Sequence, residues 1–256
     1  MHTGAINSYF DVAQLVLYGF WIFFFGLIYH IRKEDKREGF PLVSDLPGRI
    51  RLDEAGPMPM PKTFLLHDGT TVMAPRHEAP AAEPKAVPSG SWPGAPLDPT
   101  GDPMIDGVGP ASWVNRSDKP DVVWETGQPR IVPLRVDLSF GIPSEDPDPR
   151  GMTVIGCDEQ AAGTVVDAWV DRSETVLRFL EVEIPDGRHV LVPLAMARVR
   201  GGSRTVKVRS ITSVQFANVP QIKNPEQITR LEEDKIYGYF AGGTLYATAD
   251  RMEPLL

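Results

Sequence analysis

A long run of uncharged, mostly apolar residues near the N-terminus constrains this chain more than any other feature. Residues 12–31 read VAQLVLYGFWIFFFGLIYHI and contain no Asp, Glu, Lys or Arg. An α-helix of this length spans about 30 Å, the thickness of the hydrocarbon core of a bilayer. Aromatic side chains would lie on every face of the helix, which argues against a buried helix of a soluble core. The run therefore predicts a transmembrane helix.

The charges beside this span indicate its orientation. No Lys or Arg precedes residue 32, whereas RKEDKR follows at 32–37. A cleaved signal peptide carries basic residues before the apolar run and a small-residue cleavage site after it. Because basic residues concentrate on the cytoplasmic side, we expect a retained, single-pass span with residues 1–11 outside and the main domain in the cytoplasm. The basic residues either mark topology alone or also contact anionic lipid headgroups.

The chain is acidic and contains a single cysteine. Its net charge of −8 argues against a nucleic-acid partner. Cys157 cannot form an intramolecular disulfide and indicates no metal site, which fits a reducing compartment for the main domain.

Residues 32–110 are expected to form an extended, proline-rich segment. Residues 41–110 hold 14 of the 25 prolines, and proline fixes φ and removes a backbone donor. Residues 75–100 fit either a disordered linker or an extended segment that lies against a partner protein. One hairpin is predicted where Asp68-Gly69 separates two β-prone runs in TFLLHDGTTVM.

Residues 111–256 are predicted to form a mainly-β domain with a C-terminal helix. Closely spaced β-prone runs separated by turn signals are typical of a small antiparallel sheet or barrel, and they lie at 163–171, 176–184, 189–199 and 205–211. The helix is expected at about 225–240. Asn224 would cap it, Pro225 would lie in its first turn and Gly242-Gly243 would end it.

The usual sequence signatures of catalysis and metal binding do not occur in the sequence. It has no H-E-x-x-H, C-x-x-C, phosphate loop or G-x-S-x-G, and its five histidines do not cluster at metal spacing. We therefore predict no catalytic, cofactor-binding or metal-binding residue, and an anchored hydrolase would need scattered residues to assemble.

One predicted strand carries a charge among apolar residues. Alternation along 176–184 places Arg178 on one face with four apolar side chains. A partly buried arginine needs a carboxylate partner, and Asp171, Glu174 and the acidic run 232–234 are the candidates.

Asp171 and Glu174 flank the turn DRSE. Close carboxylates raise each other's pKa, whereas a nearby arginine opposes the rise. The pair is either able to pass on protons near neutral pH or an ordinary charged hairpin end, and the residue pattern leaves both interpretations open.

Five segments in conserved order carry a resemblance to a known family, the H subunit of the photosynthetic reaction centre of purple bacteria. The segments are DVAQLVLYGFWIFFFGLIYHIRKEDKREGFPL (11–42), PTGDPMIDGVGPASWV (99–114), GCDEQAAGTVVDAWVD (156–171), RFLEVEIPDG (178–187) and LEEDKIYGYFAGG (231–243). Residues 43–97 and 117–150 match poorly.

The resemblance implies a single N-terminal transmembrane α-helix plus a mainly-β cytoplasmic domain, a PRC-type β-barrel with a C-terminal helix. The protein would lie in the inner, intracytoplasmic membrane with a periplasmic N-terminus. It would be a non-catalytic subunit that stabilises the L and M subunits, caps the quinone sites and conducts cytoplasmic protons to the secondary quinone during light-driven electron transfer.

The same resemblance implies cofactors and partners. This chain alone would bind no cofactor, and the complex would hold bacteriochlorophyll, bacteriopheophytin, quinones and a non-haem iron in L and M. A cytochrome subunit, a light-harvesting antenna ring and membrane lipids are further candidate partners. The alternative function is a membrane-tethered PRC-barrel interaction module for another protein partner, because the acidic charge disfavours RNA.

The resemblance also assigns proton-transfer candidates. Asp171 and Glu174 in WVDRSE match carboxylates that the family uses near its proton path, and Arg178 and Glu233 match an arginine and a glutamate of the same interior network.

The proton entry is expected to differ from that of better-known members. The histidine pair that serves as proton entry there has no counterpart in DKPDVVWETGQPR, residues 118–130. Asp121 and Glu125 are the candidate substitutes.

Overall fold

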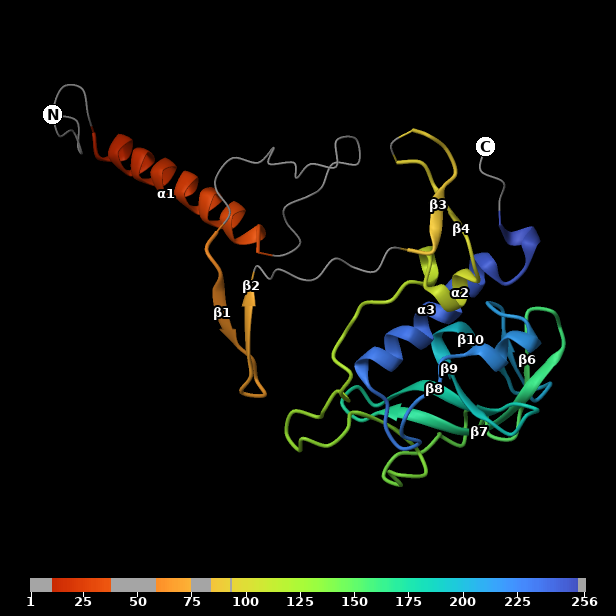
Figure 1. Ribbon diagram of the computed structural model, residues 1–256. Coiled ribbons are helices and arrows are strands. Elements are labelled where there is room, and N and C mark those ends of the chain that lie inside the picture. Colours follow the sequence, from red (N-terminus) through yellow and green to blue (C-terminus); the bar gives the residue numbers. More distant parts are fainter. Residues whose placement is uncertain (1–10, 38–58, 75–83, 93, 253–256) are drawn as a thin grey trace. The chain divides into compact units, whose positions relative to one another are not determined.

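The computed structural model describes residues 11–37, 59–74, 84–92 and 94–252 and divides the chain into two compact units (Figure 1). One unit contains the N-terminal helix and a hairpin, and the other contains the barrel. Residues 1–10 of the expected periplasmic segment and residues 38–58 of the proline-rich segment lie outside the described residues.

Helix α1 (Val12–Asp35) is long and apolar enough to cross a membrane. It begins at a capping box, in which Asp11 accepts a hydrogen bond from the Gln14 amide at 2.7 Å and the Gln14 side chain accepts one from the Asp11 amide. Its apolar side chains are exposed along the whole helix, Ile22 to 75%. The helix surface therefore suits lipid or another transmembrane chain rather than water.

The predicted hairpin around Asp68-Gly69 is confirmed. Strands β1 (Lys62–Leu65) and β2 (Thr71–Ala74) pair antiparallel, and Gly69 has a φ of +79°, in the left-handed region that favours glycine.

Arg37 attaches this hairpin to the end of α1. Its guanidinium donates to Glu34 at 2.9 Å, to the Ala74 carbonyl at 3.2 Å and to the Met60 carbonyl. Lys62 pairs with the same Glu34 at 3.5 Å. Arg37, one of the basic residues after the span, therefore also holds the β1–β2 hairpin at the end of the helix.

A seven-stranded sheet is the main element of the second unit. The strand order is β10-β11-β6-β7-β8-β9, with β5 also paired to β7. The pairing of β11 with β6 is parallel and the rest are antiparallel, so the expected antiparallel sheet or barrel is observed with one parallel pair. The strands are β5 (Ile131–Pro133), β6 (Thr153–Ile155), β7 (Ala161–Asp171), β8 (Val176–Glu183), β9 (His189–Pro193), β10 (Ala197–Arg200) and β11 (Thr205–Val208).

The sheet curls into a barrel because its two end strands are consecutive in the chain. In a flat sheet, β9 and β10 would be about 24 Å apart at about 4.8 Å per strand. The chain from Pro193 to Ala197 reaches at most about 14 Å. A 3-10 turn at Leu194–Met196 makes this connection, so the run 189–199, predicted as one strand, is two strands at opposite ends of the sheet.

Helix α3 (Arg230–Tyr246) covers part of the barrel core. The rings of Phe240 and Phe216 pack edge-on with their centroids 6.2 Å apart, and the rings of Tyr237 and Phe179 of β8 do so with centroids 5.4 Å apart. Trp169, Phe179, Phe216 and Phe240 are among the largest fully buried side chains. Burial of this aromatic core stabilises the helix on the barrel.

The predicted cap and end of this helix were wrong. Thr229 and Glu232 form the capping box instead of Asn224, whose side chain accepts the amide of Glu226 in a turn. The helix continues through Gly242-Gly243, because the missing side chains let Ala111 and Ser210 approach closely.

Short elements precede the barrel in the second unit. Strands β3 (Ala86–Pro88) and β4 (Leu97–Pro99) form a second hairpin in the stretch for which a linker or an extended segment was expected. Helix α2 (Pro103–Asp106) and a 3-10 turn at Gly109–Ala111 follow it and pack against α3.

Gly163 allows β7 to lie close to β8. A Cβ atom there would overlap the carbonyl oxygen of Glu183. We expect Gly163→Ala to lower the free energy of unfolding by about 2–3 kcal/mol, because backbone on the neighbouring strand must move. Gly202→Ala is the matched control: nothing lies within 4 Å of its Cβ position, so its effect should stay within about 0.5 kcal/mol. Urea denaturation followed by tryptophan fluorescence measures both, and equal effects would contradict this reading.

Candidate functional site

The turn between β7 and β8 is organised by one buried carboxylate. Asp171, the last residue of β7, accepts the backbone amides of Ser173 at 3.0 Å and Glu174 at 3.1 Å. Its carbonyl accepts the amide of Thr175 at 2.8 Å. Only 1% of the Asp171 side chain is exposed. The sequence DRSE therefore folds around Asp171 and places Glu174 at the surface, 59% exposed.

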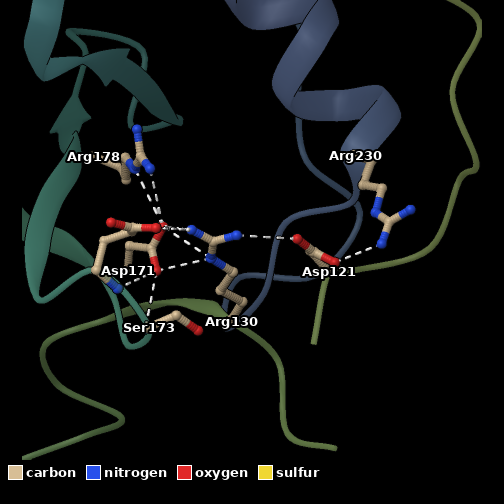
Figure 2. Close-up of polar contacts among 7 residues, drawn as sticks. Asp121, Arg130, Asp171, Ser173, Arg178 and Arg230 are labelled. Carbon is tan, nitrogen blue, oxygen red and sulfur yellow. Dashed lines mark hydrogen bonds and ion pairs between the residues drawn. The ribbon is translucent and has the colours of Figure 1, made fainter. Parts of the chain in front are cut away.

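Two arginines pair with the carboxylate of Asp171 (Figure 2). Arg130 contacts both carboxylate oxygens, with Nε at 2.9 and 3.0 Å, and Arg178 contacts Oδ2 through Nη2 at 3.2 Å. Burial by itself raises the pKa of Asp171, but the Arg130 hydrogen bond, the turn amides and the Arg130 charge outweigh it and lower this pKa overall. Asp171 is therefore a fixed anion near neutral pH.

Arg130 connects three carboxylates. Besides Asp171, it contacts Glu174 at 3.2 Å and Asp121 at 3.4 Å. Strand β5 positions it, because Ile131 is paired with Asp171 and Arg130 directly precedes Ile131. The hydrogen bond to Asp171 raises the pKa of Arg130, so its charge is permanent. Arg130 was missed by the sequence reasoning, and its only signal there was its position before a short apolar run.

Asp121 extends the network to α3. It accepts a hydrogen bond from Arg230, the first residue of the helix, at 2.5 Å. Burial raises the pKa of Asp121, but Arg230 and Arg130 outweigh this and lower it overall. Figure 2 shows the resulting order, in which Arg130 lies between Asp171 and Asp121 and Arg230 lies beyond Asp121. We call Asp121, Arg130, Asp171, Glu174, Arg178 and Arg230 the β-turn network.

A β-bulge directs Arg178 toward this network. Trp169 pairs with Phe179 and Val170 with Leu177, so Arg178 is an additional residue in β8. The prediction that Arg178 has a carboxylate partner is confirmed by its pairing with Asp171. Its side chain is 39% exposed, more than strict alternation suggests, because the bulge interrupts the alternation.

Among the predicted proton-transfer candidates, Glu233 is the one whose pKa is raised. It is half-buried on α3, and burial is the main cause of the rise. The charges of Asp121 and Asp234 add to it, while those of Arg178 and Arg116 oppose it. The upward shift considered for the Asp171 carboxyl is therefore found at Glu233, whereas the pKa of Asp171 is lowered.

Glu125 lies apart from the β-turn network. It is exposed in the turn 123–127, and it forms no ion pair with any residue that the structure describes. Of the two candidate substitutes for a histidine entry, only Asp121 is joined to the other candidates.

A second charged cluster was missed by the sequence reasoning. Glu181 is buried and accepts hydrogen bonds from Arg135 at 2.5 Å and from the Trp169 indole at 2.9 Å, and it lies 2.7 Å from His189 Nδ1. Asp167, opposite Glu181 on β7, pairs with the same Arg135 at 3.0 Å. The signal in the sequence was that Asp167 and Glu181 would lie directly opposite each other on paired strands. Two like charges in this position repel each other and therefore indicate a nearby cation.

The described residues contain no group of three or more His, Cys, Asp or Glu side chains placed to hold a metal ion. The acidic residues of the β-turn network face arginines, whose guanidinium groups are permanent hydrogen-bond donors. The carboxylates of the network are therefore paired with guanidinium groups.

Two family models match the chain. The PRC-barrel domain matches residues 144–215, so the second unit defines a PRC-barrel protein that carries an apolar N-terminal helix. The model described as photosynthetic reaction centre, H-chain N-terminal region matches residues 4–136, just over half of the 256 residues. The chain belongs to the photosynthetic reaction centre H-chain family. Members of this family are structural subunits, so the protein is membrane-bound and associates with the reaction-centre core.

Proposed function

We propose that this chain is the H subunit that stabilises the L and M subunits, caps the quinone sites and conducts cytoplasmic protons to the secondary quinone. The β-turn network carries the proposal, because it joins an exposed carboxylate, a buried fixed anion and a helix terminus within a member of the H-chain family. In the reaction it would serve, a quinone takes up electrons, together with protons from the cytoplasm, and becomes a quinol.

Each residue would have a distinct role in proton conduction. Glu174, exposed at the surface, exchanges protons with water. Arg130 couples its charge to Asp171 and Asp121, so protonation of one carboxylate changes the affinity of the others. Asp171 remains charged and attracts protons, and Glu233, whose pKa is raised by burial, takes up a proton more readily than an exposed glutamate does. Arg178 acts on both residues. It pairs with Asp171, and its charge opposes the rise that burial causes in the pKa of Glu233.

The membrane arrangement is part of the same proposal. Residues 1–11 are periplasmic, 12–31 span the membrane, 32–110 form the connecting segment and 111–256 are cytoplasmic, as supported by the basic residues that follow the span. The exposed apolar surface of α1 supports contact with L, M and lipid. The pigments, quinones and non-haem iron are held by L and M, and a cytochrome subunit and an antenna ring complete the candidate partners.

Glu174→Gln tests the proton role. In the purified complex, we expect about a tenfold slower proton-coupled transfer of the second electron to the quinone, and a larger slowing when Asp171→Asn is added. Flash spectroscopy at mildly acidic to alkaline pH measures this rate, and retained near-infrared pigment shows that the complex has assembled. Asp186→Asn at the next hairpin turn, where Asp186 pairs with Arg188, is the control. Unchanged rates for both the single and the double variant at every pH would refute the role.

A further inference from the structure

A largely apolar cavity of about 510 Å³ lies at the end of the barrel where β7 ends and β8 begins. Its walls come from β7, β8, the Leu194–Met196 turn and β10, and the loop 140–149 lies over it. The apolar side chains that define it include Leu134, Phe140, Ile142, Leu177, Leu194 and Val199. This volume falls within the range of about 300–1,000 Å³ typical of small-molecule sites, and the mouth of a barrel is a frequent place for one.

The lining decides which chemistry fits. Asp146 and Thr175 carry the polar side chains of the lining. A peptide segment entering the cavity would bring amide and carbonyl groups that need hydrogen-bond partners, and these two side chains cannot satisfy them. An alkyl chain needs no such partners, and Asp146, exposed on the loop, leaves the mouth compatible with a polar end in water.

A second cavity, also of about 510 Å³, provides a contrast within the same barrel. Its lining combines apolar residues, among them Leu138 and Val166, with Arg135, Arg150, Asp167, Glu181 and His189, whereas the charged residue in the lining of the first cavity is Asp146. An alkyl chain in this second cavity would remove water from charged groups, which is unfavourable. The two cavities have the same volume, so the lining decides which one suits an alkyl chain.

The backbone of the cavity wall is strained. Thr175 has a φ of +55°, in the left-handed region that a β-branched residue rarely adopts. Strain of this kind persists where the surroundings fix the backbone, and it concentrates at ligand sites. Thr175 and Val176 line the cavity, and the same turn holds Asp171 and Glu174.

We propose that this cavity binds the aliphatic chain of an amphiphile, either a fatty acyl or an isoprenoid chain. The chain lies against Leu177, Leu194 and Val199, and its polar end remains at the mouth near Asp146. Binding at this site does not depend on the proposed proton role, because it rests on the cavity alone.

A chain-length series tests the proposal. The full-length chain is held in a detergent-free amphipathic polymer, and bound cis-parinaric acid is displaced by saturated 1-alkanols from octanol to tetracosanol, whose neutral hydroxyl avoids repulsion by Asp146 at the mouth. We expect each added methylene to tighten binding about fourfold until the cavity is full, and no further gain after that. Partition into the polymer would instead continue to strengthen with length. Farnesol and geranylgeraniol form the isoprenoid arm, and displacement by one arm alone identifies the source of the chain.

Cavity-filling variants locate the site. Ile142→Trp places an indole in the cavity from the covering loop, and we expect at least a tenfold loss of probe affinity. Ile105→Trp, on the 53% exposed Ile105 of α2, introduces the same change elsewhere and should leave the affinity unchanged. Val199→Phe fills the cavity from β10, so it provides a second test if Ile142→Trp fails to fold. Absence of a length plateau, or full affinity in a folded cavity-filling variant, would overturn the proposal.

Discussion

Replacement of Asp171 by asparagine is expected to lower the free energy of unfolding of the barrel by about 2–4 kcal/mol. The side chain is 1% exposed and faces Arg130 and Arg178. Asparagine keeps the shape and one acceptor oxygen but removes the charge. The two guanidinium groups would then repel each other without a shared anion. Since Arg130 and Arg178 are 25% and 39% exposed, water relieves part of this cost, and the effect stays below that of a fully buried pair.

Asp186→Asn is the matched control for this change. Asp186 also accepts a backbone amide in a hairpin turn and pairs with an arginine, Arg188, but both side chains are nearly half exposed. Its effect should be clearly smaller, because solvent screens an exposed ion pair. Urea unfolding of the full-length chain, followed by the fluorescence of buried Trp169, compares the two. If Asp171→Asn cost no more than Asp186→Asn, the β-turn network would not stabilise the fold.

The difference between wild type and Asp171→Asn should depend on pH. The pKa of Asp171 is lowered in the folded protein, so its stabilisation is complete above the unfolded value of about 3.9. It is lost as pH falls through the lower folded value, where wild type also becomes neutral. The two unfolding curves should therefore converge in acid and separate toward neutral pH.

Local patterns in the sequence predicted the elements that depend on local physics. The apolar run gave α1, Asp68-Gly69 gave the first hairpin, and β-prone runs gave β7 and β8. The end of α3 depended on tertiary packing instead. Gly242-Gly243 reads as a helix stop, but these residues remain helical where Ala111 and Ser210 pack against them.

The centre of the candidate site could not be predicted for a similar reason. Arg130 and Asp171 are far apart in sequence and meet only because the short strand β5 pairs with the end of β7. The bulge at Arg178 adds a residue that strict alternation does not anticipate. The type of partner for Arg178 was predictable from charge and burial, whereas the second arginine on the same carboxylate required the fold.

Glu233→Gln should separate a proton-transfer role from a structural one. We expect the proton-coupled second electron transfer in the complex to slow by about tenfold or more, because glutamine, unlike glutamate, cannot take up and release a proton. Glu226→Gln, on the exposed loop before α3, is the control and should leave the rate unchanged. Flash spectroscopy of the two complexes at several pH values measures both rates. The wild-type rate in Glu233→Gln would exclude Glu233 from the path.

The stability of Glu233→Gln should change in the opposite direction from that of Asp171→Asn. Burial raises the pKa of Glu233 in the folded protein. Its favourable contribution is therefore complete below the unfolded value of about 4.3 and is lost as pH rises through the folded value. At alkaline pH the wild-type protein must bury the charged Glu233 carboxylate, which costs stability. Glutamine carries no charge, so the variant should equal wild type in acid and match or exceed its stability at alkaline pH. A variant that is slower in proton transfer yet no less stable cannot owe its defect to misfolding. Destabilisation at alkaline pH would instead show that the Glu233 charge supports the fold.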